Sequence, residues 1–480
     1  MVPGFTLINQ FSTILQLAAS FCGVPEVCCD RLTTVLPEEK VFKSFDPNYK
    51  IENNKYWSST AVLTPACIFV PESSSDVSIA IKVLVESSCE FGVRGGGHTT
   101  NPGWAGTDSG VLISLSKLTA VEVSGDKKPV AVGTGSRWGE VYTKTGEQNV
   151  AVAGGRVSKV GVSGFLLGGG LSFLMFAEGF AADNVLSYEA SVPIVLASGQ
   201  VATITADSNG DLFKALKGGG SNFGIVTSFD LQTHPIKDIY AGFLYYSPEQ
   251  YDALFPTMED PSRKVDTATF YTAYSEPVTA PPPAIKPFFD IPNTRSAVKI
   301  KTMQEATDES TEGCVDGLRY NMQTYSVRAD AGLFKQLFDI WHASAIGFNS
   351  TVPGWTSGII YQPISNSMLR ASEKKGGNVL GLKPANDPLM VVSYQFTWER
   401  SEDDNEVYAA IDKLVADSTG VARSQGRLER YIYLNYAGSK QQPIESYGPD
   451  QVEFLRKVRA KYDPNRVFEN LSRGGFKIPS

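Results

Sequence analysis

The spacing of apolar positions in the first half of the chain predicts helices that alternate with short strands. Residues 75–86 place Val77, Ile81 and Leu84 on one helical face, directly after a Ser/Asp start signal. A short apolar strand at 91–93 follows this helix. Further strands are expected at 111–115, 121–123, 130–132, 150–153, 187–205 and 225–232, with helices at 138–148 and 209–217. This alternation predicts a mixed α/β domain that ends near residue 236.

The pattern changes in the second half of the chain. Prolines are frequent across residues 237–300 and include the run 281–283, which marks loops and a domain boundary. The elements expected beyond it are helices at 332–345, 405–416 and 449–462 and a strand at 391–398. These elements predict a second α+β domain, followed by a short segment that closes the chain.

Length and charge agree with this division and exclude one class of partner. A chain of 480 residues exceeds the usual size of one hydrophobic core, so two domains are expected. Hydrophobic residues make up 42% of the chain, which is enough to bury a large core around a ligand. The net charge of −8, with no block of basic and aromatic residues, argues against a nucleic-acid partner.

The cysteines point to disulfides rather than to a metal. The chain has no CxxC pair and only three histidines, so no zinc or other metal site is expected. Five of the six cysteines lie within the first 89 residues, which suits one or two disulfides that pin an N-terminal segment. Buried free thiols in a reducing compartment are the alternative. The six are Cys22, Cys28, Cys29, Cys67, Cys89 and Cys314.

The N-terminal segment, residues 1–37, resembles a weak secretory signal. Residues 5–21 are moderately apolar, and Ala18 and Ser20 offer small residues for cleavage. The stretch is too short and too polar for a membrane span. Two glycosylation sequons begin at Asn349 and Asn470. Secretion or an endomembrane location is therefore favoured, and a cytoplasmic location is the alternative.

The segment from Arg94 to His98 carries the first chemical signal. Three consecutive glycines, Gly95, Gly96 and Gly97, follow a buried strand and expose backbone N–H groups suited to a pyrophosphate. A histidine follows at once, which favours a functional role over a structural one.

A Rossmann dinucleotide site fits the sequence poorly. Gly133-Thr-Gly135 is followed by Ser136-Arg137-Trp138 and lacks the third glycine of that fingerprint. A P-loop and a nucleophile elbow are also missing from the sequence. NAD is therefore not the expected cofactor.

The sequence resembles the vanillyl-alcohol-oxidase superfamily of flavoproteins with a PCMH-type FAD-binding domain. Within it, the chain is most similar to berberine-bridge-enzyme-like FAD-linked oxidases, especially the fungal members. The resemblance covers residues 55–470 in the family's order and is carried by FGVRGGGHTTNPGWAGTDSGVLISLSKL (91–118), GGRVSKVGVSGFLLGGG (154–170), FAADNVLSYE (180–189), GGGSNFGIVT (218–227), YLNYA (433–437) and YDPNRVFEN (462–470).

The resemblance implies an α+β fold with two domains. A PCMH-type FAD-binding domain of two α/β subdomains is expected at 38–236. A substrate domain with an antiparallel sheet covered by helices is expected at 237–424. The segment 425–480 is expected to return to the FAD domain, with the substrate pocket at the junction.

The resemblance also implies where FAD binds. His98 occupies the position that bonds the 8α-methyl carbon of the flavin in this family. A cysteine forms a second bond in many relatives, but Val157 stands at that position, so a single covalent link is expected. Val160 aligns with the position that gates oxygen, and a small valine there resembles oxidases. The other implied cofactor contacts are Arg94, Gly95, Gly96, Gly97 and Thr99 at the pyrophosphate; Gly161, Val162, Gly164, Gly168 and Gly169 on the second side; Asn184, Gly224 and Val226 near the adenosine or ribityl part; and Asn435.

Three residues are candidates for catalysis. Tyr433 matches a tyrosine beside flavin and substrate in related enzymes, although a phenol with a pKa of about 10 needs a cation or hydrogen bond to act as a base. A core tyrosine is the alternative. Gln362 stands where sugar-oxidising relatives carry an acidic residue, which weighs against a carbohydrate substrate. One of Tyr394 and Gln395 is expected to line the pocket.

The reaction implied by the resemblance is an oxidation. A small organic substrate resembling a secondary metabolite gives a hydride to FAD, Tyr433 takes a proton, and molecular oxygen accepts the electrons. A cyclase or isomerase with no net redox change is one alternative, and a binding protein with a vestigial flavin site is another. The expected partners are a substrate molecule and oxygen, and the protein is expected to be a monomer.

Overall fold

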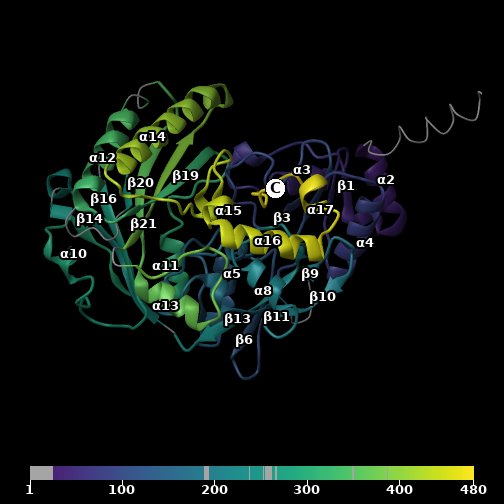
Figure 1. Cartoon of the computed structure of the whole chain (residues 1–480), viewed down its shortest axis with the longest axis horizontal. Helices are drawn as coiled ribbons and strands as arrows, with labels where there is room; N and C mark the ends of the chain where they lie inside the picture. Colours follow the sequence, from purple (N-terminus) through teal and green to yellow (C-terminus); the bar gives the residue numbers. More distant parts are fainter. Residues whose placement is uncertain are drawn as a thin grey trace, which may run out of the picture.

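The computed structural model describes residues 25–480, apart from 189–193, 237, 252, 255–261, 265–266, 347, 349–350 and 386–387. The apolar stretch 5–21 and the sequon at Asn349 therefore lie outside the described residues. Figure 1 shows two lobes, and the C-terminal segment runs across the lobe that contains the N-terminal half of the chain.

The first subdomain is a four-stranded sheet of order β1-β2-β4-β3, in which β2, β4 and β3 are parallel. The strands are β1 (Val41–Lys43), β2 (Cys67–Phe69), β4 (Val111–Ser114) and β3 (Phe91–Arg94). Helix α4 (Ser74–Glu86) begins as expected, because Ser73 accepts a hydrogen bond from the Asp76 N–H, and it buries Val77, Ile81 and Leu84. Helix α2 (Pro25–Val35) packs on α4.

Two disulfides fasten α2 to this sheet. Cys28 bonds to Cys89 and Cys29 bonds to Cys67. The expectation that disulfides pin the N-terminal segment is confirmed, and the free-thiol alternative is wrong for these four cysteines. Cys314 forms no disulfide with another cysteine of the described residues.

The second subdomain is a six-stranded antiparallel sheet joined by a smaller three-stranded one. The larger sheet contains β11 (Ile204–Thr205), β8 (Val185–Tyr188), β13 (Ser228–His234), β6 (Pro129–Gly133), β5 (Val121–Val123) and β7 (Ala151–Val152). The smaller one contains β10 (Val201–Ala202), β9 (Ile194–Val195) and β12 (Ile225–Val226). Helices α5 (Trp138–Glu147), α6 (Val162–Leu167) and α8 (Gly210–Leu216) belong to the same subdomain.

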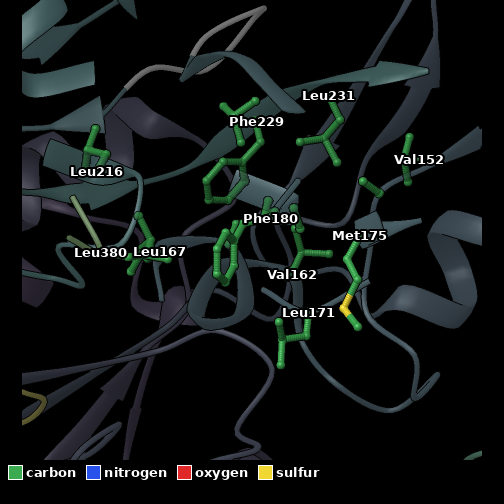
Figure 2. Packing of buried hydrophobic residues seen from close by; sticks show 14 of the residues in the cluster. Val152, Val162, Leu167, Leu171, Met175, Phe180, Leu216, Phe229, Leu231 and Leu380 are labelled. Carbon is green, nitrogen blue, oxygen red and sulfur yellow. The ribbon is translucent and has the colours of Figure 1, made fainter. Parts of the chain in front are cut away.

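The apolar core of this subdomain extends into the rest of the chain. In Figure 2, Phe180, Val162 and Phe229 pack together, and Leu380, from far along the sequence, lies beside Leu167. Leu380 follows α13 (Asn366–Lys374), which itself packs on α7 (Met175–Glu178). The two lobes therefore share one continuous core.

The other lobe is built on a nine-stranded sheet whose pairings are all antiparallel. Its long strands are β14 (Asp238–Tyr246), β16 (Thr267–Tyr274), β19 (Arg319–Arg328), β20 (Thr356–Ile364) and β21 (Leu389–Trp398). Helices α12 (Ala331–Ile346) and α14 (Asp404–Ser424) cover one face (Figure 1). The expected α+β class, with an antiparallel sheet covered by helices, is confirmed.

The end of the chain packs on the first lobe. The segment contains α15 (Pro443–Ser446), α16 (Pro449–Tyr462) and α17 (Val467–Asn470). Helix α16 contacts α8, and the Phe468 ring meets the edge of Phe91 in β3 at a centroid distance of 6.2 Å. Across the described part of the chain, none of the helices is both long enough and apolar enough to cross a membrane.

Candidate functional site

Two glycine loops meet backbone to backbone at the end of β3. A Cβ atom on Gly96 would lie 2.3 Å from the Gly161 Cα, so each position admits only glycine. Gly97 has φ +65°, a conformation that favours glycine. Gly161 comes directly before α6. A Cβ atom on Gly164, within this helix, would have no atom within 4 Å. The two loops expected on either side of the cofactor are thus neighbours.

A cavity of about 160 Å³ opens beside these loops. It is lined by Gly95, Gly96 and three cationic residues, Lys55, Arg94 and Arg137. Exposed backbone and positive charge suit a diphosphate. The cavity is smaller than a whole dinucleotide, so binding of FAD requires the surrounding groups to move apart. A second cavity, of about 500 Å³, lies near the start of α16 and is lined by none of the predicted site residues.

Arg94 does not lie as the sequence suggests. Its guanidinium is 1% exposed and donates to the Glu52 Oε1 at 2.7 Å, the Glu52 carbonyl at 2.8 Å and the Ser114 Oγ at 2.9 Å. Burial by itself raises the Glu52 pKa, because it disfavours the charged form. Hydrogen bonds from Lys55 and Ser114 and the charge of Arg94 outweigh burial and hold the pKa below its ordinary value. The charge of Arg94 thus faces Glu52 behind the loop, and its expected contact with the pyrophosphate stays a prediction.

Arg137 is a cation at the cavity that sequence reasoning missed. It lines the same cavity as Gly95, and its guanidinium donates to the Lys159 carbonyl. Its backbone also forms a bridge with Gly161. Arg137 follows the glycines Gly133 and Gly135, which do not complete a Rossmann fingerprint. A cationic side chain shortly after two glycines was the available signal in the sequence.

His98 lies in a stack of aromatic rings. Its imidazole is parallel to the Trp57 ring, with centroids 4.2 Å apart and planes inclined by 14°. The other stacking partner of Trp57 is Tyr320 of β19, at 3.8 Å. The His98 Nε2 is buried and has no hydrogen-bond partner among the described residues. Burial and the charge of Arg137 lower the His98 pKa to about 4, so the imidazole is neutral near pH 7.

Tyr433 and Asn435 lie against the second glycine loop. A Cβ on Gly168 would fall 2.0 Å from the Asn435 Oδ1, and Gly169 has φ +104°. The Tyr433 hydroxyl accepts hydrogen bonds from the Leu171 N–H and the Asn435 Nδ2, both at 3.1 Å. Burial raises the Tyr433 pKa well above its ordinary value, although the charge of Arg156 opposes this. Tyr433 is therefore a poor proton acceptor, and it lies before a 3-10 turn (Leu434–Tyr436) rather than on a strand.

Three predicted cofactor residues, Asn184, Gly224 and Val226, contact other residues of the protein. The Asn184 amide nitrogen donates to the carbonyls of Glu178 and Phe180, and its oxygen accepts from Lys375. The expected contact of Asn184 with the adenosine or ribityl part stays a prediction. A Cβ on Gly224 would meet Ile194 at 2.7 Å, and Val226 pairs with Ile194 in the small sheet.

The remaining predicted cofactor residues lie near the two loops. The Thr99 hydroxyl accepts a hydrogen bond from the Asn101 N–H at 3.2 Å. Val157 and Val160 are half-buried on the segment that leads into Gly161, and Val162 is fully buried.

Gln362 and Tyr394 lie on opposite faces of the large sheet. Tyr394 points into the helix layer, where its hydroxyl meets the Tyr325 hydroxyl at 3.1 Å and the Ser418 Oγ at 2.7 Å, and burial raises its pKa to about 12. The expectation that Tyr394 lines the pocket is wrong, because side chains alternate along a strand. Its neighbour Gln395 lies on the opposite face of the sheet, the face that also carries Gln362. Gln395 is half-buried and Gln362 is buried.

Arg156 connects three distant segments at that face. Its Nη2 donates to the Gln362 Oε1 of β20 and lies 3.1 Å from the Tyr436 hydroxyl of the C-terminal segment. Sequence reasoning missed both Arg156 and Tyr436. The available signal was their position, since Arg156 directly precedes Val157 and Tyr436 ends the YLNY motif.

Comparison with known proteins identifies the class. Residues 65–205 match the model of the FAD binding domain family. The FAD-dependent monooxygenase drtC of Aspergillus calidoustus is 32% identical, over 95% of this chain and 91% of its own. The FAD-dependent monooxygenase sdcF of Emericella nidulans is 34% identical, over 95% and 99%.

Solved structures show the same fold. The xylooligosaccharide oxidase of Myceliophthora thermophila superposes with a TM-score of 0.78 at 19% identity and covers 95% of this chain and 100% of its own. The 6-hydroxy-D-nicotine oxidase of Arthrobacter nicotinovorans gives 0.77 at 20%, over 92% and 97%. The glucooligosaccharide oxidase of Acremonium strictum, described with a 6-S-cysteinyl, 8α-N1-histidyl FAD, gives 0.74 at 18%, over 91% and 97%.

The fold and the family model together define an FAD-dependent oxidoreductase with a PCMH-type FAD-binding domain. The expectation of FAD is confirmed. The chain belongs to the same family as these fungal relatives, which are named FAD-dependent monooxygenases.

Proposed function

We propose that this protein is an oxidase that holds FAD through a single covalent bond to His98. The observation that carries the proposal is the buried His98 Nε2, which has no partner among the described residues and belongs to a neutral imidazole next to the glycine loop. A neutral imidazole has the lone pair that bonding to a carbon atom requires. Val157 replaces the second attachment cysteine of many relatives, which supports one bond rather than two.

The protein's own groups would position the cofactor and the substrate. Arg137 and the backbone of Gly95 and Gly96 suit the diphosphate. FAD, when bound, supplies the acceptor for a hydride and is reoxidised by molecular oxygen. Asn435 and Tyr433 hold the 168–171 loop at the edge of this site.

Tyr436 is a better candidate for the base than Tyr433. Tyr436 is half-buried, and its hydroxyl lies 3.1 Å from the Arg156 Nη2. Tyr433 is fully buried and its oxygen already accepts two hydrogen bonds, so it suits a positioning role. The substrate would lose a hydride from a C–H bond, for which bound FAD would supply the acceptor, and a separate proton from an O–H or N–H bond, which Tyr436 would take. Molecular oxygen would then take up the two electrons and two protons as hydrogen peroxide.

The substrate is proposed to be a small organic molecule rather than a sugar. Gln362 supplies no carboxylate at the position that is acidic in sugar-oxidising relatives. The related fungal proteins are named monooxygenases, which makes insertion of one oxygen atom a second candidate. A cyclase or isomerase reaction without net redox change is a third. Release of peroxide, incorporation of labelled oxygen, and anaerobic bleaching of the flavin separate these reactions.

The location and the assembly are also proposals. The two disulfides near the N-terminus suit an oxidising compartment, which supports a secreted or endomembrane protein. A monomer is proposed on the sequence alone.

The covalent bond is tested by denaturing the purified protein in acid and measuring flavin fluorescence in the pellet. We expect the wild type and the control variant His342→Ala, changed on α12, to retain flavin in the pellet. His98→Ala should release it into the supernatant. Flavin retained in the His98→Ala pellet would contradict the assignment.

A further inference from the structure

The cavity of about 500 Å³ near the start of α16 has an apolar wall. Its volume falls in the range of cavities that bind small organic molecules, about 300–1,000 Å³. Four buried aliphatic side chains line it, on β20, β21, α13 and the segment that follows α13: Ile364, Leu389, Leu369 and Leu380. Leu380 also lies beside Leu167 of the second glycine loop (Figure 2). Such a wall suits the hydrocarbon part of a ligand.

Two exposed cations line the same cavity, and neither has an acidic partner among the described residues. They are Lys383 and Arg430. The Arg430 Nη2 donates to the Tyr447 carbonyl at 3.4 Å, and a Cβ on Gly448 would fall 2.5 Å from the Arg430 Nη1. The guanidinium therefore lies against Gly448, the residue directly before α16.

The balance of charge at this cavity favours an anion. Three cations and two acids line its described part. Arg328 and Glu429 form an ion pair with each other at 2.6 Å, which leaves the exposed Asp450 as the acid that faces the two cations. Helix α16 begins without a side-chain cap, so the positive end of the helix adds to the charge of Arg430.

A buried hydroxyl at the cavity lacks a hydrogen bond. Tyr431 lines the cavity and is 2% exposed, and its hydroxyl has no partner in the described part of the chain. Burial raises the Tyr431 pKa well above its ordinary value, so the group stays protonated and can donate. A buried hydroxyl without a partner costs free energy, which an acceptor atom on a bound ligand would restore.

We propose that this cavity is a second ligand site, which binds a small monocarboxylic acid with an apolar body. The carboxylate would accept charge-assisted hydrogen bonds from Arg430 at the start of α16. The apolar body would lie along the aliphatic wall, and the Tyr431 hydroxyl would donate to an oxygen of the ligand. None of the predicted flavin or substrate residues lines this cavity, so the inference does not depend on the proposed function.

The test is isothermal titration calorimetry on the purified flavin-containing protein. The probes are octanoate, its neutral analogue octanamide, and acetate, which has the charge without the apolar body. We expect octanoate to bind more tightly than either of the others by about tenfold or more, because it alone satisfies both the cation and the aliphatic wall.

Four variants assign the binding to this cavity. Arg430→Gln should weaken octanoate binding by about tenfold and leave octanamide unchanged. Asp450→Asn should bind octanoate more tightly than the wild type does, because a like charge is removed. Ala385→Trp fills the cavity without changing any charge and should prevent binding. Arg423→Gln removes an exposed arginine of α14 that does not line the cavity, and this control should bind as the wild type does.

Thermal unfolding and flavin content are measured first, so that only folded variants are compared. Octanoate that binds no more tightly than octanamide or acetate overturns the inference. Unchanged octanoate binding in folded Arg430→Gln or Ala385→Trp protein also overturns it, because the ligand would then bind elsewhere. Each of these results leaves the attachment of flavin to His98 untouched, since the acid-pellet measurement decides that proposal.

Discussion

The buried ion pair behind the first glycine loop makes a testable claim about what Arg94 does. If Arg94 braces the loop through Glu52, replacing it should destabilise the protein even when no cofactor is bound. Arg94→Met keeps much of the side-chain volume and removes the charge and all the hydrogen bonds. It leaves the Glu52 carboxylate buried, with its Oε1 still accepting from the Ser114 Oγ at 2.6 Å and its Oε2 facing the Lys55 Nζ at 2.7 Å.

The size of the loss follows from these contacts. Breaking a buried pair by removing one partner costs about 3–5 kcal/mol. The two remaining partners of Glu52 place the expected loss in unfolding free energy at the lower end, about 3 kcal/mol. The control is Lys117→Met, which breaks an equally short pair with Glu72 at 2.6 Å, where both side chains are about half exposed. That loss should be much smaller than the loss in Arg94→Met, because solvent screens an exposed pair.

The assay is urea denaturation followed by tryptophan fluorescence, on flavin-free protein. The folded-state pKa of Glu52 is lowered, so the pair stabilises the protein above the ordinary glutamate pKa, and this contribution is lost as the pH falls through the folded-state value. The gap between Arg94→Met and the wild type should therefore narrow in acid. A variant that unfolds with the wild type and the control, yet incorporates less flavin, would refute the bracing argument and restore Arg94 as a direct phosphate ligand.

Three further predictions concern the same lobe. Gly96→Ala should prevent flavin incorporation, measured by pellet fluorescence, because its Cβ would overlap Gly161, whereas Gly125→Ala, with open space around it, should not. Replacing Cys28 and Cys89 with serine should lower the free energy of unfolding by about 4 kcal/mol, because the bond closes a loop of 61 residues; a loss below about 1 kcal/mol would contradict this. In flavin-free protein, the unprotonated His98 should make stability fall by up to about 3 kcal/mol as the pH drops from about 6.5 to 4, since only the unfolded state takes up the proton; His98→Gln should flatten this dependence.

Local patterns predicted the elements whose apolar spacing is regular. Helix α4, helix α16 and strand β3 lie within a residue or so of their expected limits, because each has a clear start signal or a dense apolar run. The strands expected near 187–205 are the short strands β8, β9, β10 and β11, whose separate limits the sequence did not predict. Apolar content alone cannot reveal such interruptions.

Residue roles that depend on side-chain direction were less predictable. Tyr394 and Gln395 are adjacent, and only the register of β21 decides that Gln395 faces the FAD lobe. Arg94 belongs to the expected motif, but Glu52, 42 residues earlier, determines where its charge lies. Motif matching places a residue in a loop and does not fix its partner.

The candidate site is made of pieces that no single segment contains. His98 reaches Trp57 and, through it, Tyr320 of the large sheet, and Arg156 is held by β20 and by the C-terminal segment. The Trp57–Tyr320 and Arg156–Gln362 contacts cross from one lobe to the other, so both the histidine and the cation depend on docking of the substrate lobe. If docking is what orients His98, Tyr320→Ala should reduce covalent flavin although residue 320 lies outside every flavin motif. Tyr320→Phe keeps the ring and should preserve attachment. Equal flavin content in both variants would show that the FAD lobe orients the imidazole alone.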